Sequence, residues 1–458
     1  MEVFKVEKTG HDRIFLMKQL TVTVFLIFLL GATSYGQAAK HVILISIDGF
    51  RPDFYKDKSW TAPNMQKLMA EGVYANGVNS VFPSVTYPSH TTLITGAMPA
   101  RHGIYYNAPY GAKNGQWYWE ESYIKTKTLW DAIREAGLKS GAVMWPVTVG
   151  APIDYNFPVR RADNDENSDQ LSVTMPYVTP GNLIQQIESA TGKLSKADFN
   201  TSNTIDQTIG KMANYMISTY KPNLMAMHFV TIDHLQHEYG RDAAQVKKAV
   251  AMVDSIIGSV VKTVEKAGLK NSTAILITGD HGFVDTKVSL SPNTWLLQNK
   301  LLSKTDWTAK FLSSGGSAFL YLKNRNDMKT LSKVKAIIAG LPADQKKLFR
   351  LVNRKELDKI GANPEVTMAL SMANGVAANN DFSGETVKPK KNGGTHGYFP
   401  DFYDIRTGFI ATGAGINTGA EIKEMGIQDI APIISDLLGL KFKSPDGLLI
   451  PRILKNKP

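Results

Sequence analysis

The feature that most constrains the fold of this chain is the segment His41–Phe50, an apolar run that ends near an aspartate and a glycine. Val42 to Ile45 are unbroken aliphatic residues, and Ile47 follows after one serine. A nearly continuous apolar run of this length is typical of a strand buried on both faces, as in a parallel sheet. Asp48 would then lie at the carboxyl end of the strand, where open α/β sheets bind ligands. Taken alone, Asp48 is explained by an ordinary turn, so its function depends on what else converges on it.

Strand and helix patterns alternate along the rest of the chain. The extended apolar segment 223–232, for example, is followed by a long helical pattern over 242–268. This alternation predicts an α/β fold with a central, mostly parallel sheet flanked by helices. Two stretches, near 151–197 and 286–391, lose the pattern and are predicted to be insertions that form cap segments. We therefore expect one catalytic domain over residues 39–458.

The N-terminal residues 1–38 have the composition of a secretory signal peptide. The apolar run Leu20–Leu30 follows Arg13 and Lys18 and is followed by small residues. Met17 is an alternative start, because the signal is more typical from there. The run is shorter than the about 20 residues that a membrane span needs. We expect an exported protein, periplasmic or secreted, with no membrane span after removal of the signal.

Composition excludes several classes of function. The chain has no cysteine, which excludes disulfides, thiolate zinc sites and cysteine nucleophiles. A metal would need carboxylate, imidazole or hydroxyl ligands. The formal net charge is +11, but the basic residues are scattered, and no Lys/Arg tract with interleaved aromatic residues indicates a nucleic-acid groove.

Four clusters of aspartate and histidine lie at the boundaries of predicted strands, and three of them are flanked by glycine. Their residues are Asp48, Asp233, His237, Asp280, His281 and His396. Each cluster alone is weak evidence, because a lone histidine is more often a satisfied polar group than a ligand. Together, in a chain without cysteine, three aspartates and three histidines supply two sets of three oxygen and nitrogen ligands. That is enough for two divalent ions that each keep an open position.

A possible nucleophile lies in Pro83–His90, which places several hydroxyl groups at the start of a helix predicted over 86–95. Serine or threonine at such a place usually caps the helix. The helix N-terminus also favours a bound anion, and a nearby cation would activate a hydroxyl group as a nucleophile. The two interpretations are compatible.

Six segments, in order between about His41 and Leu440, carry a family resemblance. They are Ser46–Gly49, Phe82–His90, His102–Asn107, Asp233 with His237, Gly279–Gly282 and Thr395–Tyr398. This set resembles the nucleotide pyrophosphatase/phosphodiesterase family of the alkaline phosphatase superfamily. The resemblance covers nearly the whole chain after the signal and implies an alkaline phosphatase-like fold.

The resemblance also implies a role for each matching residue. One zinc ion would be held by Asp48, Thr86, Asp280 and His281, and a second by Asp233, His237 and His396. Thr86 would be the nucleophile, through a phospho-threonine intermediate, and Asn107 would hold a non-bridging phosphate oxygen. Tyr87 would stack on a nucleoside base. Tyr155, downstream of Trp145-Pro146, is expected to be the second aromatic residue of that pocket.

The implied activity is hydrolysis of phosphodiester or phosphoanhydride bonds in a small-molecule substrate, expected to be a nucleotide. Relatives also act on choline-containing phosphodiesters. The first alternative is a threonine-nucleophile alkaline phosphatase, which adds a Lys-x-Arg pair to meet the extra charge of a monoester. No such pair follows Met144, although Arg160-Arg161 can serve in principle. The second alternative is a non-catalytic metal-binding protein, but all seven ligand positions carry suitable atoms.

Overall fold

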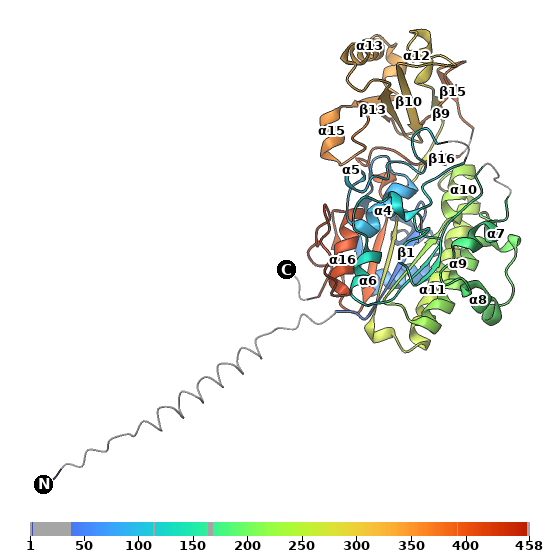
Figure 1. Cartoon of the computed structure of the whole chain (residues 1–458), viewed down its shortest axis with the longest axis vertical. Helices are drawn as coiled ribbons and strands as arrows, with labels where there is room; N and C mark the ends of the chain where they lie inside the picture. The colour runs from blue at the N-terminus through green and yellow to red at the C-terminus, as the bar shows by residue number, and fades with distance from the viewer. Residues whose placement is uncertain (1, 3–37, 113–114, 164–167, 392, 456–458) are drawn as a thin grey trace. The chain divides into compact units, whose positions relative to one another are not determined.

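An eight-stranded sheet lies at the centre of the chain (Figure 1). Its strands, in order across the sheet, are β18 (Ala420–Ile422), β2 (Val73–Ala75), β17 (Phe409–Gly413), β7 (Thr273–Gly279), β1 (His41–Ile47), β6 (Leu224–Phe229), β4 (Ser140–Val143) and β5 (Tyr155–Phe157). Neighbouring strands run parallel except at β17, which is antiparallel to both β2 and β7. The predicted mostly parallel sheet is therefore confirmed.

The computed structural model describes residue 2 and residues 38–112, 115–163, 168–391 and 393–455. The proposed signal peptide lies outside these residues apart from Glu2 and Ala38. Among the described residues, no helix combines the length and the apolar character that crossing a membrane requires.

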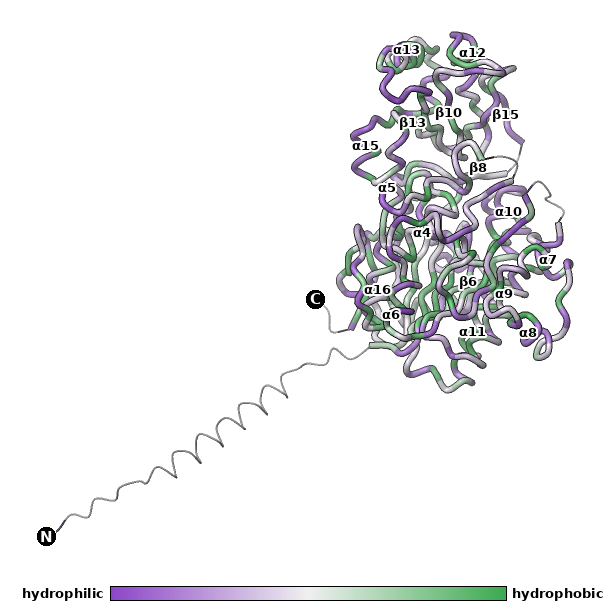
Figure 2. The backbone as a smooth tube through the Cα atoms, viewed as in Figure 1, coloured by the Kyte–Doolittle hydropathy of each residue, from purple (hydrophilic) through white to green (hydrophobic). Residues whose placement is uncertain are grey.

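Strand β1 is buried on both faces, as its sequence indicates. It pairs with β6 on one side and β7 on the other, both parallel. Because side chains alternate along a strand, Val42 and Leu44 join the core on one face of the sheet, whereas Ile43 and Ile45 join the core on the other. Figure 2 shows hydrophobic residues gathered around these central strands.

Helices cover both faces of the sheet (Figure 1). On the face of Val42 they are α4 (Thr86–Thr95), α6 (Leu129–Glu135) and α16 (Ile430–Leu437). On the face of Ile43 they are α3 (Pro63–Glu71), α8 (Leu183–Thr191), α9 (Ile205–Tyr220) and α11 (Ala244–Lys266). Helix α4 has the predicted bounds, and its end is set by Gly96, whose φ of +60° suits a glycine.

Two segments differ from the sequence expectation in ways that matter for the site. Strand β6 ends at Phe229 rather than Ile232, because a helix, α10 (Thr231–Tyr239), begins almost at once. Residues 151–197 also contribute β5 to the edge of the main sheet, so this stretch does not lie wholly outside the core. The boundaries of the two insertions stay a prediction.

A second, four-stranded antiparallel sheet belongs to the later variable stretch. It consists of β10 (Ala309–Ser314), β11 (Ser317–Leu322), β13 (Met368–Met372) and β12 (Phe349–Val352) in spatial order. Its core includes residues of α12 (Asn293–Gln298) and α13 (Met328–Ala339), and it is separate from the two cores of the main sheet. The hydroxyl groups of Tyr106 and Tyr321, 3.0 Å apart, connect this sheet to the segment after α4.

Candidate active site

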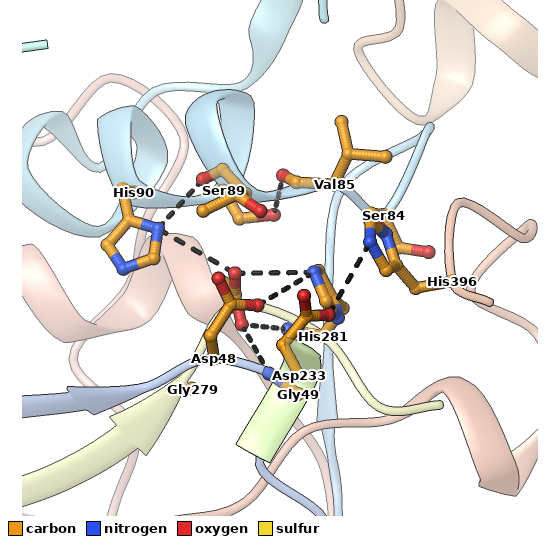
Figure 3. A network of polar contacts seen from close by, with 12 residues as sticks. Asp48, Gly49, Ser84, Val85, Ser89, His90, Asp233, Gly279, His281 and His396 are labelled. Atoms are coloured by element: carbon orange, nitrogen blue, oxygen red, sulfur yellow. Dashed lines mark hydrogen bonds and ion pairs between the residues drawn. The ribbon is translucent and has the colours of Figure 1, made fainter. Parts of the chain in front are cut away.

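Carboxylate and imidazole groups from distant parts of the chain meet at the carboxyl edge of the central strands (Figure 3). Ile47 at the end of β1 pairs with Gly279 at the end of β7. The residues that follow these strands therefore lie side by side, and Asp48 meets Asp280 and His281. The strand register alone accounts for this half of the site.

The other half comes from α10 and from the segment after a short strand, β16 (Gly394–Thr395). Asp233 and His237 are four residues apart on α10, which puts both side chains on one face of that helix. His396 directly follows β16. The Nδ1–H group of His237 donates to the carbonyl of Gly394 at 3.2 Å, which ties the two segments together.

The first cluster surrounds Asp280. Its Oδ1 accepts the backbone N–H groups of Gly49 at 3.1 Å and His281 at 3.0 Å. Its Oδ2 is buried without a hydrogen-bond partner among the described residues and lies 3.3 Å from Nε2 of His281. Oδ1 of Asp48, also unpartnered in the described chain, lies 3.4 Å from the same nitrogen.

The second cluster surrounds Asp233. Its Oδ1 lies 3.5 Å from Nε2 of His237 and 3.6 Å from Nε2 of His396, and it has no hydrogen-bond partner within the described residues. The rings of His281 and His396 stack with centroids 3.7 Å apart, so the two clusters adjoin. The ligand atoms of Asp48, Asp280 and His281 lie within 4.8 Å of one another, and so do those of Asp233, His281 and His396. Figure 3 shows Asp48, Asp233 and His281 close together.

The hydrogen bonds of His281 and His396 leave the Nε2 atom of each ring available as a metal ligand. His281 donates Nδ1–H to the carbonyl of Gly282, and His396 donates Nδ1–H to the carbonyl of Ser84, each at 3.0 Å. The neutral rings therefore present a bare Nε2 lone pair, the usual arrangement of metal-binding histidines. Tetrahedral ligand atoms about 2.0–2.1 Å from a zinc ion lie about 3.3–3.4 Å apart. The 3.3–3.6 Å separations in the two clusters match that spacing, so the residues fit a metal site.

The pKa values of the clustered aspartates and histidines also favour a bound cation. Burial raises the pKa of Asp48 well above its usual range, and the neighbouring carboxylates of Asp233 and Asp280 raise it further. Burial also raises the pKa of Asp233, to about 6. Burial lowers the pKa of His281 and His396 well below the usual value, so both rings are neutral. The raised pKa values show that ionised carboxylates are unfavourable here, and a bound cation would stabilise their ionised forms.

Thr86 lies at the first position of α4 and lines the same cavity as Asp48 and His237. It does not cap the helix: Val85 is the N-cap residue, and no side chain makes a capping bond there. The hydroxyl group of Thr86 has no hydrogen bond to any residue that the structure describes. Asn107 accepts the backbone N–H of Tyr87 through Oδ1 at 3.0 Å, which leaves the N–H groups of its side chain available for an anion.

Two further histidines were not singled out by the sequence analysis. His90 donates Nδ1–H to the carbonyl of Thr86 at 2.8 Å, and its Nε2 accepts the hydroxyl of Ser46 at 2.9 Å. His90 therefore braces the start of α4 against β1 and is not free to act as a ligand. His228 lies in the otherwise apolar strand β6, with Nε2 3.3 Å from Oδ2 of Asp48. A histidine inside an apolar strand was the signal that could have identified it.

The clusters open into a cavity of about 1410 Å³ with aromatic walls. Trp117 and Trp119 stack nearly parallel, with an interplanar angle of 9° and centroids 5.9 Å apart. Tyr87 meets both edge-on, at 5.1 Å from Trp117 and 6.0 Å from Trp119. Aromatic side chains at this position are available to bind a flat ring.

Tyr155 is not brought to this cavity. It pairs with Gly141, which is level with Met225 and Ile43 across the sheet. Ile43 lies five residues before Asp48, a distance of about 16 Å along a strand. Tyr155 instead stacks on Tyr220, with ring centroids 3.9 Å apart. The aromatic residues beside Tyr87 are tryptophans from residues 117 and 119, which the sequence analysis did not select.

Comparisons with known proteins find a matching family model and several relatives. The family model described as type I phosphodiesterase/nucleotide pyrophosphatase matches residues 42–399. Ectonucleotide pyrophosphatase/phosphodiesterase family member 7 of Rattus norvegicus is 23% identical over 454 residues, covering 96% of this chain and 92% of the relative. The bis(5'-adenosyl)-triphosphatase of Mus musculus is 25% identical over 280 residues, covering 58% of this chain and 53% of the relative.

A solved structure gives the same fold. It is the murine ectonucleotide pyrophosphatase/phosphodiesterase 5, as an inactive threonine-to-alanine variant in complex with AMP. It matches with a TM-score of 0.64 and 20% identity, over 89% of this chain and 97% of that chain.

Proposed function

This chain belongs to the type I phosphodiesterase/nucleotide pyrophosphatase family, and on that premise we propose that it is a di-zinc hydrolase of phosphodiester or phosphoanhydride bonds with Thr86 as its nucleophile. One observation carries the proposal. Two clusters of unpartnered carboxylate and imidazole atoms, spaced 3.3–3.6 Å apart, lie in the cavity that Thr86 lines.

Asp48, Thr86, Asp280 and His281 would hold one zinc ion, and Asp233, His237 and His396 the other. Bound zinc would neutralise the phosphate oxygens, lower the pKa of the Thr86 hydroxyl group and stabilise the leaving oxygen. These effects answer the main difficulty of the reaction, because an anionic phosphodiester repels a nucleophile.

The protein's own groups supply the rest of the mechanism. Thr86 attacks phosphorus and expels the leaving group, and water then hydrolyses the resulting phospho-threonine. His90 donates to the Thr86 carbonyl, which holds the backbone that carries the nucleophile. The side-chain amide of Asn107, oriented by its bond to the N–H of Tyr87, donates to a non-bridging oxygen.

A diester or anhydride substrate is favoured over a monoester. Two arginines could meet the extra charge of a monoester. One of them, Arg160, forms an ion pair with Asp163 at 3.2 Å, which holds it away from the clusters around Asp280 and Asp233. Arg161 lines the cavity and keeps the monoesterase as the second candidate. Comparing turnover of p-nitrophenyl phosphate with that of bis(p-nitrophenyl) phosphate decides between them, and the diester is expected to react faster.

The decisive test is Thr86→Ala. The variant should retain two zinc ions per chain by elemental analysis and lose turnover of bis(p-nitrophenyl) phosphate by at least about 1,000-fold. Thr91→Ala, in the same helix, is the matched control, because the Thr91 hydroxyl bonds to the Tyr87 carbonyl rather than facing the cavity. Substantial residual turnover in Thr86→Ala would exclude Thr86 as the nucleophile.

The last part of the proposal is that the protein is exported. Removal of a signal peptide ending near residue 38 would deliver the domain to the periplasm or the medium, where a nucleotide diester is the expected substrate. N-terminal sequencing of the protein recovered from each fraction tests this, and a mature chain that keeps residues 1–38 in the cytoplasm would contradict it.

A further inference from the structure

Two adjacent arginines beside the cavity have opposite surroundings. The side chain of Arg160 is only 15% exposed, lies over the ring of Trp119 at 5.3 Å and pairs with Asp163. Arg161 is exposed and lines the cavity, and its guanidinium group forms no ion pair or hydrogen bond with any residue that the structure describes. A guanidinium group carries five N–H donors in a fixed plane. Arg161 therefore presents unused donors and a full positive charge to the cavity.

Arg161 lines the same cavity as residues of the reacting site. Tyr87 follows the nucleophile Thr86 on α4, and His234 follows Asp233 on α10, and all of these residues line that cavity. The part of the cavity that borders the exposed residue Arg161 is its outer part. The positive charge of Arg161 is therefore available to a substrate bound there.

The aromatic wall beside this space suits a flat ring better than a quaternary ammonium group. Trp117 and Trp119 form a stacked pair, and Trp119 is fixed by donation of its Nε1–H to Asp163 at 3.3 Å. Aromatic walls bind quaternary ammonium groups when no other cation competes. Here Arg160 already lies over Trp119, and the free charge of Arg161 repels a second cation. A choline headgroup would therefore bind poorly.

We propose that this outer part of the cavity is a subsite for a second anionic group of the substrate, and that Arg161 is the residue that recognises it. The inference rests on the proposed function and narrows it. The substrate carries an aromatic ring and at least one negative charge beyond the scissile phosphorus, as nucleoside polyphosphates and dinucleoside polyphosphates do. Phosphodiesters with a choline headgroup are disfavoured.

The test compares three substrates on the purified zinc-loaded protein. Adenosine triphosphate carries additional anionic groups, bis(p-nitrophenyl) phosphate carries none, and p-nitrophenylphosphorylcholine carries a cation. The variants are Arg161→Gln, which removes the charge, and Arg161→Lys, which keeps it. Arg134→Gln removes an exposed charge from α6, outside the cavity, and serves as the matched control.

Arg161→Gln should lower kcat/KM for adenosine triphosphate about 10- to 100-fold, the effect of losing a hydrogen bond between charged groups. It should change kcat/KM for bis(p-nitrophenyl) phosphate less than about twofold, and Arg161→Lys should restore most of the loss. Arg134→Gln should change neither value.

Two results overturn the inference while leaving the proposed function intact. The first is an equal effect of Arg161→Gln, or no effect, on adenosine triphosphate and bis(p-nitrophenyl) phosphate. The second is a wild-type protein that prefers p-nitrophenylphosphorylcholine to adenosine triphosphate. A wild-type protein that hydrolyses none of the three substrates overturns the proposed function itself, and the inference falls with it.

Discussion

Asp206 tests how α10, the helix that carries Asp233 and His237, is held in place. It lies on α9 and is fully buried. Its Oδ1 accepts the backbone N–H of Val230 at 2.8 Å, and its Oδ2 accepts that of Thr231 at 3.2 Å. These are donors at the start of α10, which α9 therefore caps from outside the helix. Burial raises the pKa of Asp206 to about 6, and the two N–H donors only partly oppose that rise.

The size and sign of the effect follow from this pKa. A shift from the ordinary value of 3.8 to about 6 means that the folded protein binds a proton at Asp206 more tightly than the unfolded chain does. Stability from this group is therefore present below about pH 4 and is lost as the pH rises towards about 6. The difference amounts to about 2–3 kcal/mol between pH 4 and pH 7.

Asp206→Asn removes this titration. We expect the free energy of unfolding of the wild type, relative to that of Asp206→Asn, to rise by about 2–3 kcal/mol as the pH falls from 7 to 4. Urea unfolding in the presence of a chelator measures this and removes metal binding from the comparison. A constant offset, from the lost acceptor oxygen, does not affect the slope. Asp344→Asn, on the surface, is the control. A wild-type-to-variant difference that stays constant with pH would refute the reasoning.

Three other predictions concern packing, metal and substrate. Gly279→Ala should cost about 1–3 kcal/mol by thermal unfolding, because its Cβ would lie 2.6 Å from the carbonyl oxygen of Ile47 and overlap the side chain of Thr407; an unchanged melting temperature would contradict this. Zinc at 100 times its Kd should stabilise the protein by about 3 kcal/mol per site, and a melt that does not respond to a chelator would argue against a metal site. Trp117→Ala should raise KM for adenosine triphosphate about 5- to 100-fold. Tyr155→Ala should lower only the melting temperature, because Tyr155 stacks far from the cavity; the opposite pattern would reinstate Tyr155 as a binding residue.

The sequence was informative wherever structure depends on neighbouring residues. The apolar run of β1 predicted a strand buried on both faces, and the structure has it. The start and end of α4 were predicted to the residue, because a helix that ends at a glycine is a local signal. Asp48 and Asp280 were found because both follow apolar strands directly, and parallel strands deliver such residues to one edge.

Other features were missed because they depend on contacts between distant segments. The extended segment 223–232 gave no sign that α10 begins at Thr231, which puts Asp233 and His237 on a helix face. Tyr155 was selected by its distance along the chain from Trp145-Pro146, but the strand register carries it towards the other end of the sheet. Trp117 lies in a segment without periodicity, and only the folded chain brings it to Tyr87.

A metal ion bound at this site would compete with protons for the same atoms, which would link its chemistry to its stability. The pKa of Asp48 is raised by burial and by two further carboxylates, so without a cation the site binds protons instead. Binding of the proposed zinc ions would then release those protons, and the affinity for zinc should fall as the pH falls. The carboxylate of Asp48 faces His281 through Oδ1 and His228 through Oδ2. The buried strand that positions Asp48 therefore places each of its oxygens within 3.4 Å of an imidazole nitrogen, at the edge of the cavity.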